Sequence, residues 1–179
     1  MLTIPSIHGD IPFVLTSNQL KIHDTIQYYD KLLLRIPRQY GLTYYISYLA
    51  FIYPMVSITI VSPNLMMRNE ISYIIKRFMD QVTDHTNYSM YTNIITAHNI
   101  ECSGANQLYK SGIIIYPEFD HILPSPENKD YINELCIKKN TKVILCSQGN
   151  IKWKPVNINE ITLKWIHISV LIKTISYVV

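Results

Sequence analysis

The sequence predicts one α/β domain built on a mainly parallel β-sheet flanked by helices. Three observations lead to this fold class. Short, continuous apolar runs, typical of strands buried on both faces, recur along the chain. Segments with helical spacing of apolar residues separate those runs, as in βαβ units. The length of 179 residues, of which 48% are hydrophobic and 16% charged, suits one well-filled core and excludes a disordered chain.

Four apolar runs are expected to form the centre of the sheet. The clearest of them is rich in β-branched residues and is bounded by Pro54 and Pro63. Another ends at Pro37, which forces the chain out of the sheet and into a loop. The predicted central strands are Leu32–Ile36, Val56–Ser62, Ile113–Tyr116 and Val143–Ser147.

Helices are expected before and between these strands. The first has Ser17 or Asn18 available as an N-cap. The second is apolar nearly all round and stops at Pro54, as a helix packed against a sheet does. The fourth begins at Ser125 and Pro126, a common helix start. The predicted helices are Asn18–Tyr29, Tyr44–Tyr53, Leu65–Val82 and Pro126–Lys139.

Peripheral segments are expected to add further strands. Tyr91–Ala97 and Asn99–Cys102 are two short β-like pieces separated by a turn, which predicts a hairpin. The C-terminal segment 156–179 is also expected to contribute strands. Its last part, Leu163–Val179, is apolar, but polar and charged residues interrupt it, and a membrane span needs about 20 apolar residues. We therefore expect no membrane association.

The composition argues against several classes of protein. A net charge of +3 is too small to indicate a nucleic-acid binder by itself. Cys102, Cys136 and Cys146 are odd in number and widely spaced, so we expect neither a disulfide framework nor a zinc site. His98 and His121 lack partners at metal-ligand spacing, and no metal site is expected. The N-terminus lacks the pattern of a secretory signal.

The residues that follow each strand are the candidate site, because ligands bind beyond the carboxyl ends of parallel strands. The first central strand is followed by Arg38–Thr43, at the junction where P-loop proteins surround phosphate with backbone N–H groups. The third is followed by Pro117–Asp120, where an ATPase places its metal-holding and water-activating carboxylates. The fourth is followed by Ser147–Asn150, where a γ-phosphate sensor could lie.

Taken in order, these motifs resemble the ATPase domain of large terminase subunits, the motors that drive DNA into phage and herpesvirus capsids. The resemblance covers about Phe13 to Pro155 and implies a P-loop NTPase-like core. The family's phosphate loop has the form R-Q-x-G-K-T, and it is matched at four positions. The matching residues are Arg38, Gln39, Gly41 and Thr43.

Three further family motifs have counterparts in the chain. A glutamine-bearing helix that touches adenine is matched by Leu15–Gln19, which implies that Gln19 contacts the base. A strand that ends in S-P-N before a long helix is matched by Ile60–Asn64. A coupling motif, in which an apolar strand runs into T-T-P-N-G, is echoed by Ile144–Asn150.

The chain departs from the family at both charged anchors. Leu42 stands where the family has its phosphate-binding lysine. Pro117 stands where the family has the aspartate that helps to hold Mg²⁺, while Glu118 occupies the position of the water-activating base. Asp120 is the nearest acidic substitute, three positions away. The sequence ends at residue 179, so we also expect no nuclease domain of the kind that follows the ATPase in full-length terminases.

Each candidate residue also has a plainer interpretation. Arg38 at a loop mouth fits a surface ion pair as well as a phosphate contact. Gln19 fits an ordinary polar residue of a helix. Glu118 without its neighbouring aspartate fits a capping or solvated acid.

We therefore expect a terminase-like, catalytically degenerate P-loop ATPase-fold protein of viral (phage) origin. It would act through binding, as a structural, DNA-packaging-associated or regulatory protein, and would need no cofactor. Its expected partner is a packaging or capsid protein or a second copy of itself, with at most weak nucleic-acid binding. It would reside in the host cytoplasm or with the virion and would not be secreted.

Two alternatives remain at this point. The first is an active DNA-packaging ATPase that uses ATP and Mg²⁺, with Arg38 or Lys31 replacing the missing lysine and Asp120 or Glu118 binding the metal. The second is an unrelated α/β interaction module.

Overall fold

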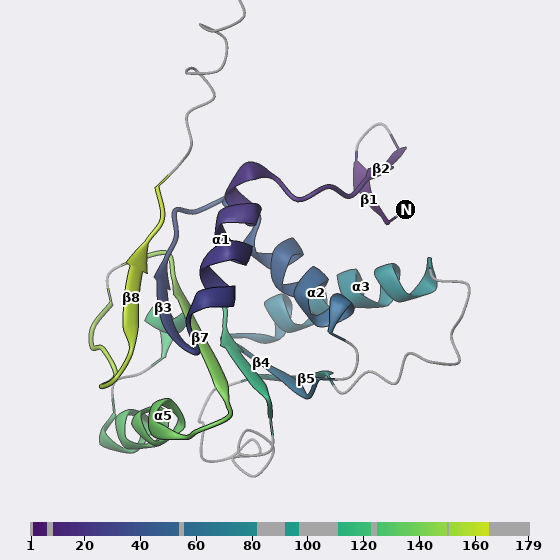
Figure 1. The fold of residues 1–179 in the computed structure, drawn as a ribbon. Coiled ribbons are helices and arrows are strands. Elements are labelled where there is room, and N and C mark those ends of the chain that lie inside the picture. Colours follow the sequence, from purple (N-terminus) through teal and green to yellow (C-terminus); the bar gives the residue numbers. More distant parts are fainter. Residues whose placement is uncertain are drawn as a thin grey trace, which may run out of the picture.

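The fold is an α/β arrangement around a six-stranded sheet in which every pairing is parallel (Figure 1). The computed structural model describes residues 2–6, 9–53, 56–81, 92–96, 111–122, 125–149 and 151–164. Across the sheet the strand order is β5-β4-β6-β7-β3-β8. In chain order these strands are β3 (Lys31–Arg35), β4 (Ile58–Ser62), β5 (Thr92–Thr96), β6 (Ile113–Tyr116), β7 (Lys142–Ser147) and β8 (Asn159–Thr162).

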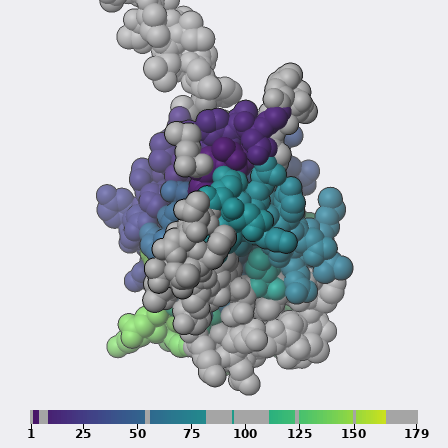
Figure 2. Space-filling model, turned by 90° about the vertical axis from the view of Figure 1, so that its right-hand side faces the viewer, coloured from purple at the N-terminus to yellow at the C-terminus, as the bar shows by residue number. Residues whose placement is uncertain are grey.

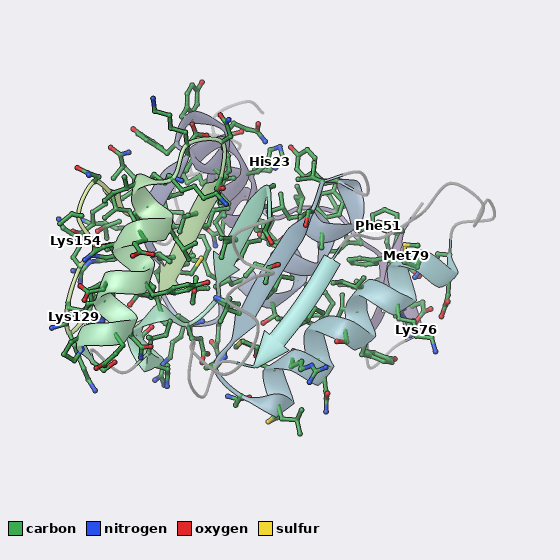
Figure 3. All side chains as sticks on the ribbon, turned by 90° about the horizontal axis from the view of Figure 1, so that it is seen from below. His23, Phe51, Lys76, Met79, Lys129 and Lys154 are labelled. Atoms are coloured by element: carbon green, nitrogen blue, oxygen red, sulfur yellow. The ribbon has the colours of Figure 1, made fainter. Side chains whose placement is uncertain are left out.

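Helices cover both faces of the sheet. Side chains that alternate along β3 divide between the two faces: Leu32 and Leu34 pack with the first three helices, whereas Leu33 packs with α5. Figure 3 shows α5 on one side of the sheet and α3 on the other. The helices are α1 (Ser17–Tyr28), α2 (Leu42–Ile52), α3 (Leu65–Asp80) and α5 (Pro126–Ile137), with a short 3-10 turn, η2 (Phe119–His121), after β6.

An antiparallel hairpin, β1 (Thr3–Ser6) and β2 (Gly9–Pro12), lies outside the main sheet. It is attached to the end of α3, where Gln81 bonds the backbone of Thr3 and Arg77 pairs with Asp10. Figure 2 shows the hairpin directly above α3 on this face of the molecule. The hairpin therefore extends the layer of helices rather than the sheet.

The four predicted central strands are confirmed, each with ends within two residues of the prediction. The four predicted helices are confirmed as well, and Ser125 caps α5 with Pro126 in its first turn. Burial explains this success: Leu32, Leu33 and Leu34 are each 0% exposed, so the strand must be apolar on both faces.

The predicted N-cap of the first helix is wrong. Thr16, and neither Ser17 nor Asn18, caps α1: its hydroxyl accepts a hydrogen bond from the Gln19 amide at 3.2 Å. In return the Gln19 side chain accepts from the Thr16 amide at 2.9 Å. This reciprocal pair is a capping box, which satisfies two amides that a helix start otherwise leaves without partners.

The predicted hairpin in the middle of the chain is only partly described. Its first piece forms β5, but β5 pairs in parallel with β4. The second piece, Asn99–Cys102, lies outside the described residues, as do His98 and the chain from 165 onward. In the segment expected to add C-terminal strands, β8 pairs in parallel with β3. None of the described helices is long and apolar enough to cross a membrane.

Two of the three cysteines are described, and both are free and buried. Burial raises the pKa of the Cys136 thiol to about 11 and that of the Cys146 thiol to about 12. Both therefore remain protonated near neutral pH, as expected of inert core thiols.

Thr16→Ala is expected to lower the free energy of unfolding by about 1 kcal/mol, because it removes the side-chain half of the capping box. Urea denaturation followed by circular dichroism measures this change. Ser17→Ala is the matched control: Ser17 is exposed and lies one residue further on, so its replacement should change stability by less than about 0.5 kcal/mol. Equal losses in the two variants would contradict the capping assignment.

Candidate functional site

The carboxyl ends of β3 and β7 form the edge of the sheet at which a ligand crevice is expected. The two strands are adjacent, and Arg35 at the end of β3 is opposite Ser147 at the end of β7. After β3 the chain enters α2 on one face of the sheet. After β7 it continues into a connection whose Ile151 and Trp153 pack on the opposite face, with α5. Neighbouring strands whose connections leave on opposite faces define the binding crevice of open α/β sheets.

A pocket of about 160 Å³ lies at this edge. Most of its wall is the loop after β3 and the first turn of α2, and the remainder comes from α3 and from the residue after β7. The lining residues are Gln39, Tyr40, Gly41, Leu42, Thr43, Tyr44, Glu70 and Gln148. The structure thus brings the predicted loop residues Gln39, Gly41 and Thr43 together around one pocket.

The loop has an unusual backbone. Gln39 and Gly41 both adopt left-handed conformations, with φ of 60° and 76°. Gly41 is the N-cap of α2 and offers no side chain to bond the first amides of the helix. Those amides and the positive end of the helix dipole make this terminus a place where an anion could be held.

Leu42 lines this pocket but brings no charge to it. Its side chain is buried and belongs to the core shared by α1, α2 and α3. Glu70, on an exposed part of α3, supplies the ionisable carboxylate of the lining. Arg38 is exposed in the same loop but is not among the lining residues. The pocket therefore combines a left-handed loop and a helix start with a carboxylate.

Tyr40 connects the loop to a distant part of the chain. It is 3% exposed, and its hydroxyl donates to the carbonyl of Lys164 at 3.3 Å, which connects the loop to the chain just after β8. Burial raises the pKa of this hydroxyl, so it remains a neutral donor at physiological pH. Thr43 has a structural contact as well, since its carbonyl accepts a hydrogen bond from the Ser47 hydroxyl.

Gln19 lies against the loop but is fully engaged within the chain. It is 3% exposed, and its Nε2 donates to the carbonyl of Gly41 at 2.9 Å while its Oε1 accepts from Thr16. The capping-box pattern T-x-x-Q was readable in the sequence, but its contact with a loop 22 residues away was not.

The candidate acids lie after β6, next to the end of β7. Glu118 is partly buried, and its carboxylate lies 3.7 Å from Nε2 of His121. Asp120 faces the loop after β7, where its Oδ1 accepts a weak hydrogen bond of 3.4 Å from the Gln148 amide. Pro117 is buried between them and β6. Among the described residues no group of three or more potential ligands could hold a metal ion.

The proposed substitution of Lys31 for the missing lysine does not fit the structure. Lys31 is the first residue of β3 and so lies at the opposite end of the strand from the loop. Its ammonium group donates to the carbonyls of Leu135 and Thr141, beside the end of α5. Burial lowers the pKa of this amine. Lys142, at the start of β7, similarly bonds the carbonyls of Ile26 and Tyr29 at the end of α1.

No protein-family model matches the sequence, and no curated protein is significantly similar to it.

Gly41→Ala is expected to lower the free energy of unfolding by roughly 1–3 kcal/mol. A Cβ atom there would be strained by the left-handed backbone and would lie 2.7 Å from Nε2 of Gln19. The cost should be smaller in a Gln19→Ala background, because that change removes the clash and leaves only the backbone strain. Chemical denaturation of the four proteins in this cycle measures both effects, and equal costs in the two backgrounds would show that the close contact is unimportant.

Proposed function

We propose that this chain is a terminase-like protein of viral (phage) origin whose P-loop-type site has degenerated, and that it acts by binding a protein partner rather than by hydrolysing ATP. Its role would be structural, associated with DNA packaging, or regulatory. The observation that carries the proposal is the composition of the pocket: residues 39–44 form most of its lining, yet Leu42 is buried in the core and the carboxylate in the lining is that of Glu70.

Electrostatics explains why such a pocket would not retain a triphosphate. P-loop proteins balance the charge of the β- and γ-phosphates with a lysine and a metal ion. Here a carboxylate lines the pocket in place of an ammonium group. The dipole of α2 contributes only a partial positive charge, which is too little to offset both a polyanion and Glu70.

The acidic motif supports the same conclusion. Mg²⁺ in NTPase sites is held by carboxylate and hydroxyl oxygens together with the phosphates. Pro117 has no such side-chain oxygen, and Asp120 is three positions away, next to the loop after β7. Glu118 could orient a water molecule, but without a bound Mg-ATP it has no reaction to assist.

A protein partner is favoured by exposed apolar side chains on the helical face. Leu65, Met66 and Tyr73 on α3 are 57%, 82% and 57% exposed. Aromatic residues and methionine are enriched at protein interfaces. Any nucleic-acid binding should be weak and fall steeply with salt, since the net charge is only +3. Size-exclusion chromatography with light scattering distinguishes self-association from recruitment of another protein.

The unmodified protein is expected to show no ATP turnover and no measurable heat of Mg-ATP binding by isothermal titration. Glu70→Lys should create binding of Mg-ATP, because it replaces the carboxylate in the pocket with an ammonium group at an exposed position. Asn69→Lys is the control, since it adds a cation to the same exposed turn of α3 but outside the pocket lining. Clear ATPase activity in the unmodified protein, lost in Glu118→Gln, would instead favour the active-motor alternative.

Restoring the two family residues is a second, independent test. Leu42→Lys combined with Pro117→Asp should gain Mg-ATP affinity, and Leu42→Lys alone should gain less because the metal site stays incomplete. Removing the buried leucine costs stability by about 1.5–3 kcal/mol, so circular dichroism must first show that the variants fold. Leu42→Met is the control for disturbance of the core. A folded double variant without any gain in binding would count against the terminase resemblance.

A further inference from the structure

The side chain of Gln19 joins two parts of the chain that are 22 residues apart. Its Oε1 accepts a hydrogen bond from the Thr16 amide, and its Nε2 donates to the Gly41 carbonyl, both at 2.9 Å. Only 3% of the residue is exposed. Both polar atoms of this amide are therefore occupied inside the molecule, at the start of α1 on one side and at the pocket loop on the other.

Gly41 is the point at which the loop becomes α2. Besides the bond from Gln19, its carbonyl accepts the first helical hydrogen bond of α2, from the Tyr45 amide at 3.1 Å. Two residues earlier, Gln39 has a φ of 60°, a conformation that costs energy for a residue with a side chain. Such backbone persists only where surrounding contacts hold it. The Gln19 bond supplies one such contact at the junction.

We propose that Gln19 is a positioning residue: its hydrogen bond to Gly41 holds the loop 38–43 against the start of α1 and so sets the shape of the pocket without any ligand. Because both polar atoms of its side-chain amide are already hydrogen-bonded within the chain, Gln19 would not be available to contact a nucleotide base. This inference does not depend on the proposed function, because the hydrogen bond between Gln19 and Gly41 forms in the protein without any ligand.

Gln19→Glu tests the hydrogen bond to Gly41 separately from the cap of α1. The introduced carboxylate can still accept a hydrogen bond from the Thr16 amide, and a negative charge suits a helix start. It cannot donate to the Gly41 carbonyl, and two acceptors would then face each other at the position of the present 2.9 Å bond. Hydrogen exchange of the Tyr45 amide, measured by NMR at neutral pH, should become about tenfold faster, as expected for the loss of one hydrogen bond. Core amides in β3 should be unchanged.

Lowering the pH provides a rescue that a general loss of stability would not show. Once protonated, the introduced carboxyl group carries a hydroxyl that can donate to the Gly41 carbonyl again. The Tyr45 protection factor, corrected for intrinsic exchange, should therefore rise towards its unmodified value as the pH falls through the pKa of that group.

Thr16→Ala is the matched control, because it weakens the cap and leaves the bond between Gln19 and Gly41 in place. It should speed exchange in the first turn of α1 but leave Tyr45 unchanged. An unchanged Tyr45 amide in Gln19→Glu, or an equal acceleration in Thr16→Ala, would overturn the proposal. Should Gln19→Glu fail to fold, Gln19→Met of similar size removes both hydrogen bonds without charge, and the same tenfold acceleration is then required.

Discussion

The parallel sheet must be buried on both faces, and most of the structure depends on this constraint. A parallel ladder needs a crossover connection for every strand, and those crossovers place helices on the faces. In β3 the consecutive residues Leu32, Leu33 and Leu34 are wholly buried, alternately in the core shared with α1, α2 and α3 and in the core shared with α5. The central strands are therefore mainly apolar, and the buried hydroxyl of Thr59 in β4 is paired with that of Ser111. The pocket lies at the carboxyl end, where β3 and β7 send their connections to opposite faces.

The same constraint explains which parts of the fold the sequence could predict. Strands buried on both faces are continuous apolar runs, so the central strands could be located to within two residues. The pairing of β5 could not, because its segment gives the same local signal whether it joins a hairpin or the edge of a parallel sheet. The start of α1 was misplaced although the T-x-x-Q pattern at Thr16 was present, since three neighbouring residues could serve as the cap.

Only those residues of the candidate site that are close together in the sequence could be predicted. The loop after β3 was located from its motif, and Gln39, Gly41 and Thr43 do line one pocket. Glu70 was not predicted, because an exposed acid on the outer turn of a helix carries no signal that it faces a loop formed almost 30 residues earlier. The engagement of Gln19 was hidden for the same reason: only the folded chain shows that both atoms of its amide are already bonded.

The residues that hold the shape of this pocket differ from those that set its charge. A substitution can therefore change the charge and leave the shape as it is. The left-handed turn at Gly41 and the bonds from Gln19 and Tyr40 maintain the loop, and none of them needs a phosphate. Leu42 adds apolar contacts to the core shared by α1, α2 and α3, which stabilises the fold without a charged group at the start of α2. The contacts that hold the loop therefore do not depend on the charge of the pocket, which here is lined by the carboxylate of Glu70.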